Sequence, residues 1–213
     1  MTFIHREGAV TTAAVDRVQR AEQQRAARRE AILQAARTVF ARKGFHGTTI
    51  ADIAEQAGIA LGTFYLYFPS KNAVFAALHD RLFDLIGRAA ARGAPAGAGL
   101  REDVRARISA VFETCGSNRE LLRLVVLNAD PTSPEARDMA RASRERERLQ
   151  AEFYRRAMDA GAIRRTDPGV LAKLINGLVS FAVYQCFVLD DGAEAPRLQD
   201  GVVDLITAAL TPR

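Results

Sequence analysis

The chain has 213 residues, enough to bury a sizeable core, and its 48% hydrophobic and 26% charged residues are ordinary for a soluble globular protein. The formal charge of +5 fits an anionic partner such as nucleic acid or a membrane surface, although charge says nothing about fold. The two cysteines are too few and too far apart to form a disulfide framework, which indicates a reducing compartment with both thiols buried.

Residues 1–24 form the first segment, for which we expect weak order. They contain no apolar run followed by a small-residue cleavage site, so no secretory signal is predicted. We interpret this basic extension as a solvated tail in preference to an arm that reaches DNA. Its arginines and those just after it are Arg6, Arg17, Arg20, Arg25, Arg28 and Arg29.

A first strong helix is predicted over about residues 25–43, with Gly44 just past its end. Its apolar face consists of residues at helical spacing, namely Ile32, Leu33, Ala36, Val39 and Phe40. A second helix over about 49–57 follows a threonine cap and ends at Gly58.

A short third helix is expected over about 60–67, because Pro69 stops it. Ser70 then caps a fourth helix that continues to about residue 92. The second and third helices, joined by a glycine that permits a sharp turn, have helix-turn-helix geometry. In this motif the first helix crosses the DNA backbone and the second enters the major groove.

The residues of this motif closely resemble the TetR (tetracycline repressor) family of bacterial regulators. The matching string over residues 48–71 is TTIADIAEQAGIALGTFYLYFPSK, and with the first helix the resemblance covers about 25–75. It implies a DNA-binding domain over 25–75 and an effector-binding and dimerisation domain over 76–213. We therefore expect an all-α protein, with an N-terminal three-helix helix-turn-helix domain joined to a larger C-terminal helical domain.

The aromatic residues of the motif are expected to divide between core and surface. Phe64 and Phe68 lie four residues apart and share one helix face, which should pack against the first two helices. Tyr65 lies on a different side, where its hydroxyl can reach a phosphate oxygen.

The resemblance adds phosphate contacts at Thr63, Tyr67 and Lys71, and base-facing positions at Leu61 and Gly62. A leucine can contact a thymine methyl but cannot hydrogen-bond to a base edge, so DNA shape or the second helix should contribute to readout. The expected DNA-binding residues are Thr48, Thr49, Leu61, Gly62, Thr63, Tyr65, Tyr67 and Lys71.

Beyond residue 92 the glycine-rich segment 93–99 reads as a flexible connection with a domain boundary nearby. Further helices are predicted over about 100–114, 119–128, 134–160, 167–189 and 196–210. The most apolar of them, Val170–Leu189, is about long enough to cross a bilayer, but polar residues interrupt it, so we interpret it as a buried helix.

The resemblance implies that the last two helices form the dimer interface, in preference to an ordinary intramolecular core. The expected interface residues are Leu174, Leu178, Phe181, Gln185, Val202, Leu205 and Ile206. The candidate effector-binding residues are Phe112, Leu124, Asn128, Phe153, Asn176, Val183, Tyr184 and Phe187.

An apolar pocket with few polar groups favours a small hydrophobic effector. The sequence after residue 151 resembles family members that sense fatty acyl compounds, and basic residues there could meet a charged head. The arginines in question are Arg155, Arg156, Arg164 and Arg165. Multidrug and other lipophilic effectors stay equally open.

The function that follows is a ligand-responsive, DNA-binding transcriptional regulator in the cytoplasm, a repressor in preference to an activator. The three histidines, His5, His46 and His79, have no partner at metal-ligand spacing, so we predict no enzyme activity, no metal and no cofactor. Two alternatives stay open: a DNA-binding protein without a small-molecule switch, and a helical protein-interaction module.

Overall fold

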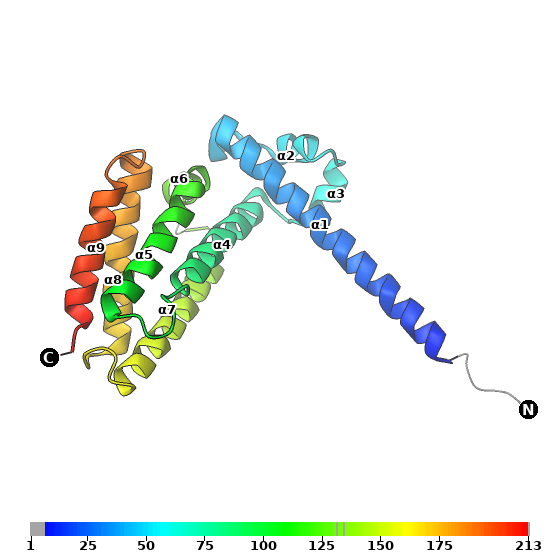
Figure 1. The fold of residues 1–213 in the computed structure, drawn as a ribbon. Coiled ribbons are helices and arrows are strands. Elements are labelled where there is room, and N and C mark those ends of the chain that lie inside the picture. Colours follow the sequence, from blue (N-terminus) through cyan, green and yellow to red (C-terminus); the bar gives the residue numbers. More distant parts are fainter. Residues whose placement is uncertain (1–6, 131, 134, 213) are drawn as a thin grey trace, which may run out of the picture. The chain divides into compact units, whose positions relative to one another are not determined.

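The computed structural model describes residues 7–130, 132–133 and 135–212, with side chains from residue 14 onward. Each element in this described part is a helix (Figure 1), as the all-α prediction required. In chain order the elements are α1 (Glu7–Gly47), α2 (Ile50–Gln56), α3 (Leu61–Tyr65), α4 (Lys71–Ala90), α5 (Leu100–Ser117), α6 (Arg119–Leu127), α7 (Ala136–Asp159), α8 (Pro168–Tyr184), η1 (Gln185–Leu189) and α9 (Ala195–Leu210).

The chain divides into two compact units between Val74 and Phe75, inside helix α4. This division lies next to the boundary expected at residue 75. The glycine-rich segment 93–99 instead joins α4 to α5 within the second unit, so the boundary expected near that segment is corrected.

Helix α1 begins at Glu7, so residues 7–24 are helical where we expected weak order. The reason is local: residues 9–43 contain neither glycine nor proline and are rich in Ala, Arg, Gln and Glu, which favour the helix. The helix therefore continues backward from its buried turns. Residues 1–6, including Arg6, lie outside the described residues.

The core of the first unit follows the predicted apolar face of α1. All five of those side chains are at most 3% exposed: Ile32, Leu33, Ala36, Val39 and Phe40. They pack with Ile53 and Ala54 of α2, which are equally buried. At Gly44 the backbone has φ 71°, which interrupts α1 as the sequence predicted, because this left-handed conformation favours glycine.

The second unit is built from helices that pack in pairs, α5 with α9, α7 with α8, and α8 with α9. Both cysteines, Cys115 and Cys186, are free and buried, as expected. Burial raises the pKa of the Cys115 thiol to about 12, so this thiol stays protonated at neutral pH.

The apolar segment predicted as one helix over 167–189 consists of two elements. Asp167 caps α8 by accepting hydrogen bonds from the backbone of Gly169 and Val170, and a π-helical turn, η1, follows Tyr184. By length and composition alone this segment could cross a membrane. Several of its residues are buried in the second unit against neighbouring helices, however, which indicates a helix of a folded domain.

Candidate nucleic-acid interface

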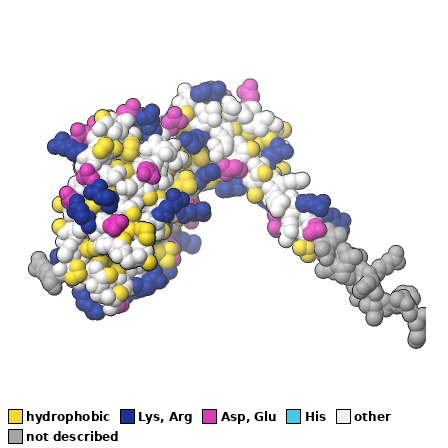
Figure 2. All heavy atoms as spheres, viewed as in Figure 1, with side chains coloured by type: hydrophobic (Ala, Val, Ile, Leu, Met, Phe, Trp, Pro, Cys, Tyr) yellow, Lys and Arg dark blue, Asp and Glu magenta, His cyan; other side chains and the backbone are white. Residues whose placement is uncertain are grey.

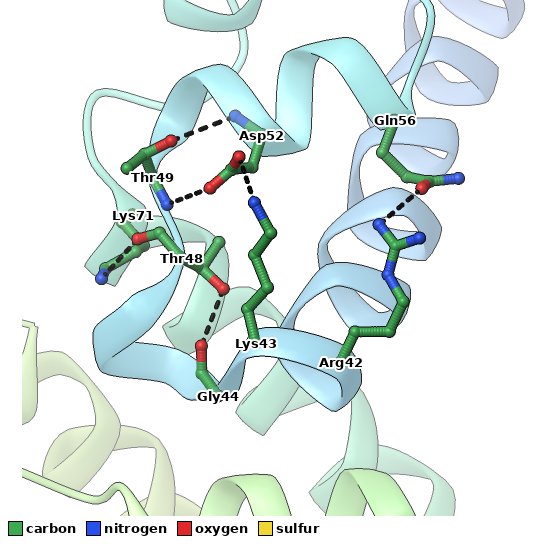
Figure 3. Close-up of polar contacts among 8 residues, drawn as sticks. All are labelled: Arg42, Lys43, Gly44, Thr48, Thr49, Asp52, Gln56 and Lys71. Atoms are coloured by element: carbon green, nitrogen blue, oxygen red, sulfur yellow. Dashed lines mark hydrogen bonds and ion pairs between the residues drawn. The ribbon is translucent and has the colours of Figure 1, made fainter.

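Helix α2 is fixed at its start by a reciprocal capping box (Figure 3). The Thr49 hydroxyl accepts a hydrogen bond from the Asp52 backbone N–H at 3.2 Å, and the Asp52 carboxylate accepts one from the Thr49 N–H at 2.9 Å. Thr49 is exposed, as a DNA-contacting residue must be. The cap fixes the direction in which α2 leaves α1.

Two side chains near the end of α1 tie α2 to it (Figure 3). Lys43 Nζ lies 2.6 Å from the Asp52 carboxylate, and Arg42 donates to the Gln56 amide oxygen at 3.1 Å. The ammonium of Lys43, followed by the hydrogen bonds from Thr49, lowers the pKa of Asp52 from 3.8 to about 2. The sequence indicated neither tie, because the partners are 9 and 14 residues apart and no pattern links them.

Gly58 makes the turn between α2 and α3. Its φ is 64°, and two hydrogen bonds close the end of α2: Gly58 N–H donates to Glu55 O, and Ile59 N–H to Ala54 O, each at 3.0 Å. This is a Schellman motif, whose left-handed residue is usually glycine. The predicted end of the second helix is thereby confirmed.

Helix α3 is shorter than the predicted 60–67 and has two distinct faces. Phe64 and Phe68 are at most 3% exposed, with ring centroids 6.1 Å apart, so their predicted core role is confirmed. Leu61 and Tyr65 are about half exposed, at 48% and 52%. One face of α3 therefore anchors it in the core, and the other is open.

The remaining positions on and just after α3 complete this open face. Gly62 is exposed and has open space where a side chain would be, while Thr63 and Tyr67 are half-buried. Leu66 is 72% exposed, and the sequence analysis missed it. The helix repeat could have predicted this exposure, because Leu66 follows the exposed Gly62 by four residues.

The expectation that Thr48 contacts DNA is corrected, because its side chain is buried. Its side chain is only 2% exposed, and its hydroxyl donates to the backbone carbonyl of Gly44 at 2.7 Å (Figure 3). This hydroxyl satisfies a carbonyl at the kink of α1. The side chain therefore holds the turn between α1 and α2 and offers no surface to a ligand.

Lys71 has a structural role that the sequence did not indicate. Its ammonium donates to two backbone carbonyls, Phe45 O at 2.7 Å and Thr48 O at 2.8 Å, and lies 4.5 Å from the centroid of the Phe45 ring. Burial lowers the pKa of this ammonium. Two of its three donors are thus used within the protein, which clamps the first turn of α4 onto the end of α1.

The residues expected at the dimer interface fall into two groups. Leu174, Phe181 and Leu205 are exposed, at 67%, 61% and 61%, and Leu178 and Gln185 are half-buried. Val202 and Ile206 are at most 4% exposed. The assignment of these last two to the interface is corrected, because they face the interior of the second unit.

The eight candidate effector-binding residues also separate by burial. Phe112, Val183 and Phe187 are buried, and the rings of Phe112 and Phe187 pack edge to face with centroids 6.0 Å apart. Phe153 is 38% exposed, and the Arg107 guanidinium lies 4.8 Å from the centroid of its ring. The other four are half-buried, namely Leu124, Asn128, Asn176 and Tyr184.

None of these eight residues lines a hollow of about 370 Å³ in the second unit that is open to solvent. Apolar side chains and two arginines form its wall: Met158, Gly161, Ile163, Arg164, Arg165 and Pro212. Among the described residues, no group of three or more His, Cys, Asp or Glu is placed to hold a metal ion.

Comparison with known proteins agrees with this motif. The model of the family described as bacterial regulatory proteins, tetR family, matches residues 32–78, which span α2, α3 and the buried part of α1. YdgC, an uncharacterized HTH-type transcriptional regulator of Bacillus subtilis (strain 168), is 25% identical over 195 residues, which cover 87% of this chain and 93% of YdgC. Residues 32–78 therefore match the DNA-binding region of the tetR family.

A second relative is more similar to this chain, but over a shorter segment. YvdT, another uncharacterized HTH-type regulator of B. subtilis (strain 168), is 53% identical over 53 residues, or 25% of this chain and 27% of YvdT. That match spans about a quarter of the length of YvdT. Both relatives are named as transcriptional regulators and not as enzymes.

A solved structure shares the fold of this chain over most of its length. It is FadR from B. subtilis in complex with stearoyl-CoA, with a TM-score of 0.69, 21% identity, and coverage of 84% of this chain and 98% of FadR. At this identity the likeness concerns the fold.

Proposed function

We propose that the chain is a ligand-responsive DNA-binding regulator, a repressor that leaves a palindromic operator when a small hydrophobic effector binds. The observation that carries this proposal is the division of α3 into a buried face at Phe64 and an open face at Leu61 and Tyr65. A helix that is anchored on one side and open on the other fits insertion into the major groove.

The open face supplies two kinds of contact. The hydroxyls of Tyr65, Thr63 and Thr49 suit phosphate oxygens, which fix position without reading sequence. Leu61 and the exposed Leu66 suit thymine methyl groups, and Gly62 allows a close backbone approach. Readout by apolar contact and DNA shape follows from this composition, because no side chain on this face can form a bidentate pair with a base.

The exposed apolar residues of α8 and α9, Leu174, Phe181 and Leu205, support a homodimer in which these helices pair across a two-fold axis. Large apolar side chains that are more than half exposed favour a covered surface. A two-fold dimer would present two α3 helices to half-sites about 34 Å apart, one turn of DNA, in the bacterial cytoplasm.

The hollow in the second unit supports an amphiphilic effector with an anionic head. Met158 and Ile163 offer apolar surface, and Arg164 and Arg165 offer guanidinium groups beside it. The FadR neighbour holds stearoyl-CoA, which makes a long-chain acyl-CoA the first compound to test. Other lipophilic compounds are the second set.

Helix α4 is the proposed transmitter, because it contains the boundary between the two units. Its first turn is clamped to the end of α1 by Lys71, so a displacement of α4 would also move the motif. Effector binding that favours a displaced α4 would then change the spacing of the two α3 helices.

The test starts with selection of bound sequences from random duplex DNA by the purified protein, followed by titration of the best site. We expect a palindrome. Tyr65→Phe keeps the ring and removes only the hydroxyl, so it should weaken binding about 10-fold to 100-fold, the equivalent of one hydrogen bond to a charged group. Tyr184→Phe, a matched change in the second unit, should leave the affinity unaltered.

Effector response is measured on the same site with stearoyl-CoA. A loss of at least about tenfold in DNA affinity would support the switch, because allosteric coupling is typically of this size. If the protein selects no sequence at low salt, the proposed function is wrong and an interaction module becomes the better interpretation. If the protein selects a palindrome but no lipophilic compound changes its affinity for that site, the chain is a DNA-binding protein without this switch.

A further inference from the structure

The N-terminal part of α1, residues 7–29, contributes no described side chain to the buried core of the first unit. We call these residues the arm. Each described side chain from Ala14 to Arg29 is exposed, and the first buried residues of α1 are Ile32 and Leu33. A helix without a buried face gains nothing from core packing, so its sequence is free to serve another partner.

The charge of the arm is arranged along one side. At 100° per residue, Arg17, Arg20, Arg25 and Arg28 fall within an arc of about 140° that contains neither Asp16 nor Glu22. Arg20, Arg25 and Arg28 form no hydrogen bond or ion pair with any described residue. The side chains of these three arginines are therefore available to an anion.

The arm begins beside the candidate recognition helix. The Arg29 guanidinium lies 4.8 Å from the centroid of the Phe68 ring, and Phe68 follows α3 by three residues. From there α1 continues well past α3 in Figure 1. At about 1.5 Å per residue the arm is about 34 Å long, close to one turn of B-DNA.

The pattern argues against a second copy of the chain as the partner. Val15 and Val18 are spaced as in a coiled-coil seam, but the next seam positions are Glu22, Arg25 and Arg29, which would place charges in the contact. Two valines do not make an apolar stripe. Four arginines on one side are instead complementary to a polyanion. Figure 2 shows dark-blue Lys or Arg side chains on the described part of the arm, with some magenta Asp or Glu side chains beside them.

We propose that the arm binds the phosphate backbone of the DNA that flanks the operator, through Arg20, Arg25 and Arg28. This inference rests on the proposed function, because the α3 face must first place the first unit on a duplex. Each arginine that neutralises a phosphate releases a counterion. The arm therefore adds affinity and salt dependence without adding sequence specificity.

The test compares two duplexes that contain the selected operator, one trimmed to the palindrome and one extended by about one helical turn, about 10 bp, on each side. The test variant is Arg20→Gln/Arg25→Gln/Arg28→Gln, since glutamine retains helix propensity. The charge-matched control is Arg137→Gln/Arg141→Gln/Arg144→Gln, at exposed positions on α7 of the second unit. Binding is measured over a series of salt concentrations.

We expect the wild type and the α7 control to bind the extended duplex at least about tenfold more tightly than the trimmed one. The arm variant should lose that gain, and the slope of log affinity against log salt should fall by about 0.9 for each lost contact. A variant that keeps the wild-type slope and flank preference overturns the proposal.

Deletion of residues 2–24 is the second variant, and it must also lose the tighter binding to the extended duplex. A deletion variant that binds both duplexes like the wild type overturns the proposal. The two hypotheses fail in different ways. Wild-type protein that binds neither duplex contradicts the proposed function itself, whereas intact operator binding without a flank effect contradicts only the role of the arm.

Discussion

Over residues 58–71, in the stretch GIALGTFYLYFPSK, adjacent side chains have opposite roles. Phe64 is fully buried while Tyr65, the next residue, is 52% exposed, and their rings meet edge to face with centroids 5.7 Å apart. The buried ring thus supports the exposed one. In the proposed complex, a side chain with a supported ring would lose less entropy when its hydroxyl binds a phosphate, so an aromatic residue suits this position.

Lys71→Met separates the structural role of Lys71 from its expected role as a phosphate contact. The change removes the donor of two carbonyls, Phe45 O and Thr48 O, so it should destabilise the first unit by about 1–3 kcal/mol. Denaturant unfolding followed by circular dichroism measures this. Lys173→Met, at an exposed lysine of α8, is the control, and wild-type stability of the Lys71 variant would contradict the clamp.

The sequence correctly predicted which side chains are buried and which are exposed where the helix repeat alone decides exposure, as at Phe64, Tyr65 and Phe68. It was wrong at Thr48, because only the fold reveals that Gly44 O lies 2.7 Å from its hydroxyl. Lys71 could not be understood from its neighbours either, since its acceptors lie 26 and 23 residues earlier in the chain.

At the scale of elements, α2 has only seven residues and is too short to be stable alone. Its position depends on the capping box at Thr49 and on the ties from Lys43 and Arg42, supplemented by the burial of Ile53. The short helix is therefore held in place by its ends as well as by its core face.

Asp52→Asn tests the tie at the start of α2 through its pH dependence. The folded pKa of about 2 lies below the ordinary 3.8, so the carboxylate stabilises the folded state above pH 3.8, and this contribution is lost as the pH falls towards 2. The variant should therefore be less stable than the wild type at pH 6, with the difference vanishing near pH 2. Thermal unfolding across this range measures it.

Glu55→Gln is the control for that experiment, because Glu55 is an exposed residue of the same helix. Its effect on the free energy of unfolding should be small and the same at every pH in the range. A difference between Asp52→Asn and the wild type that stays constant from pH 6 to pH 2 would show that charge at Asp52 is not the cause.

For the whole molecule, the proposed dimer makes operator binding depend on a surface far along the chain from α3. Phe181→Asp introduces a charge into the apolar face formed with Leu174 and Leu205. Burial of that charge should weaken dimerisation about 100-fold, since an unpaired buried charge costs several kcal/mol. Sedimentation at several concentrations measures the change, and operator affinity should fall with it.

Leu149→Asp is the matched control, at a leucine of α7 that is 52% exposed and outside that face. It should leave the assembly unaltered. If Phe181→Asp sediments like the wild type at every concentration, the two-fold axis does not run through α8 and α9.

The sequence by itself determined the helices, the turn at Gly58 and the identity of the motif, because helical periodicity, glycine and capping residues act over a few positions. Only the tertiary structure decided which apolar residues of α9 are covered: Val202 and Ile206 are buried, whereas Leu205 is exposed. It also decided that Lys71 binds carbonyls and that residues 7–24 are helical. These outcomes depend on contacts between distant segments, or on whether a helix continues past its packed turns, and local patterns do not encode them.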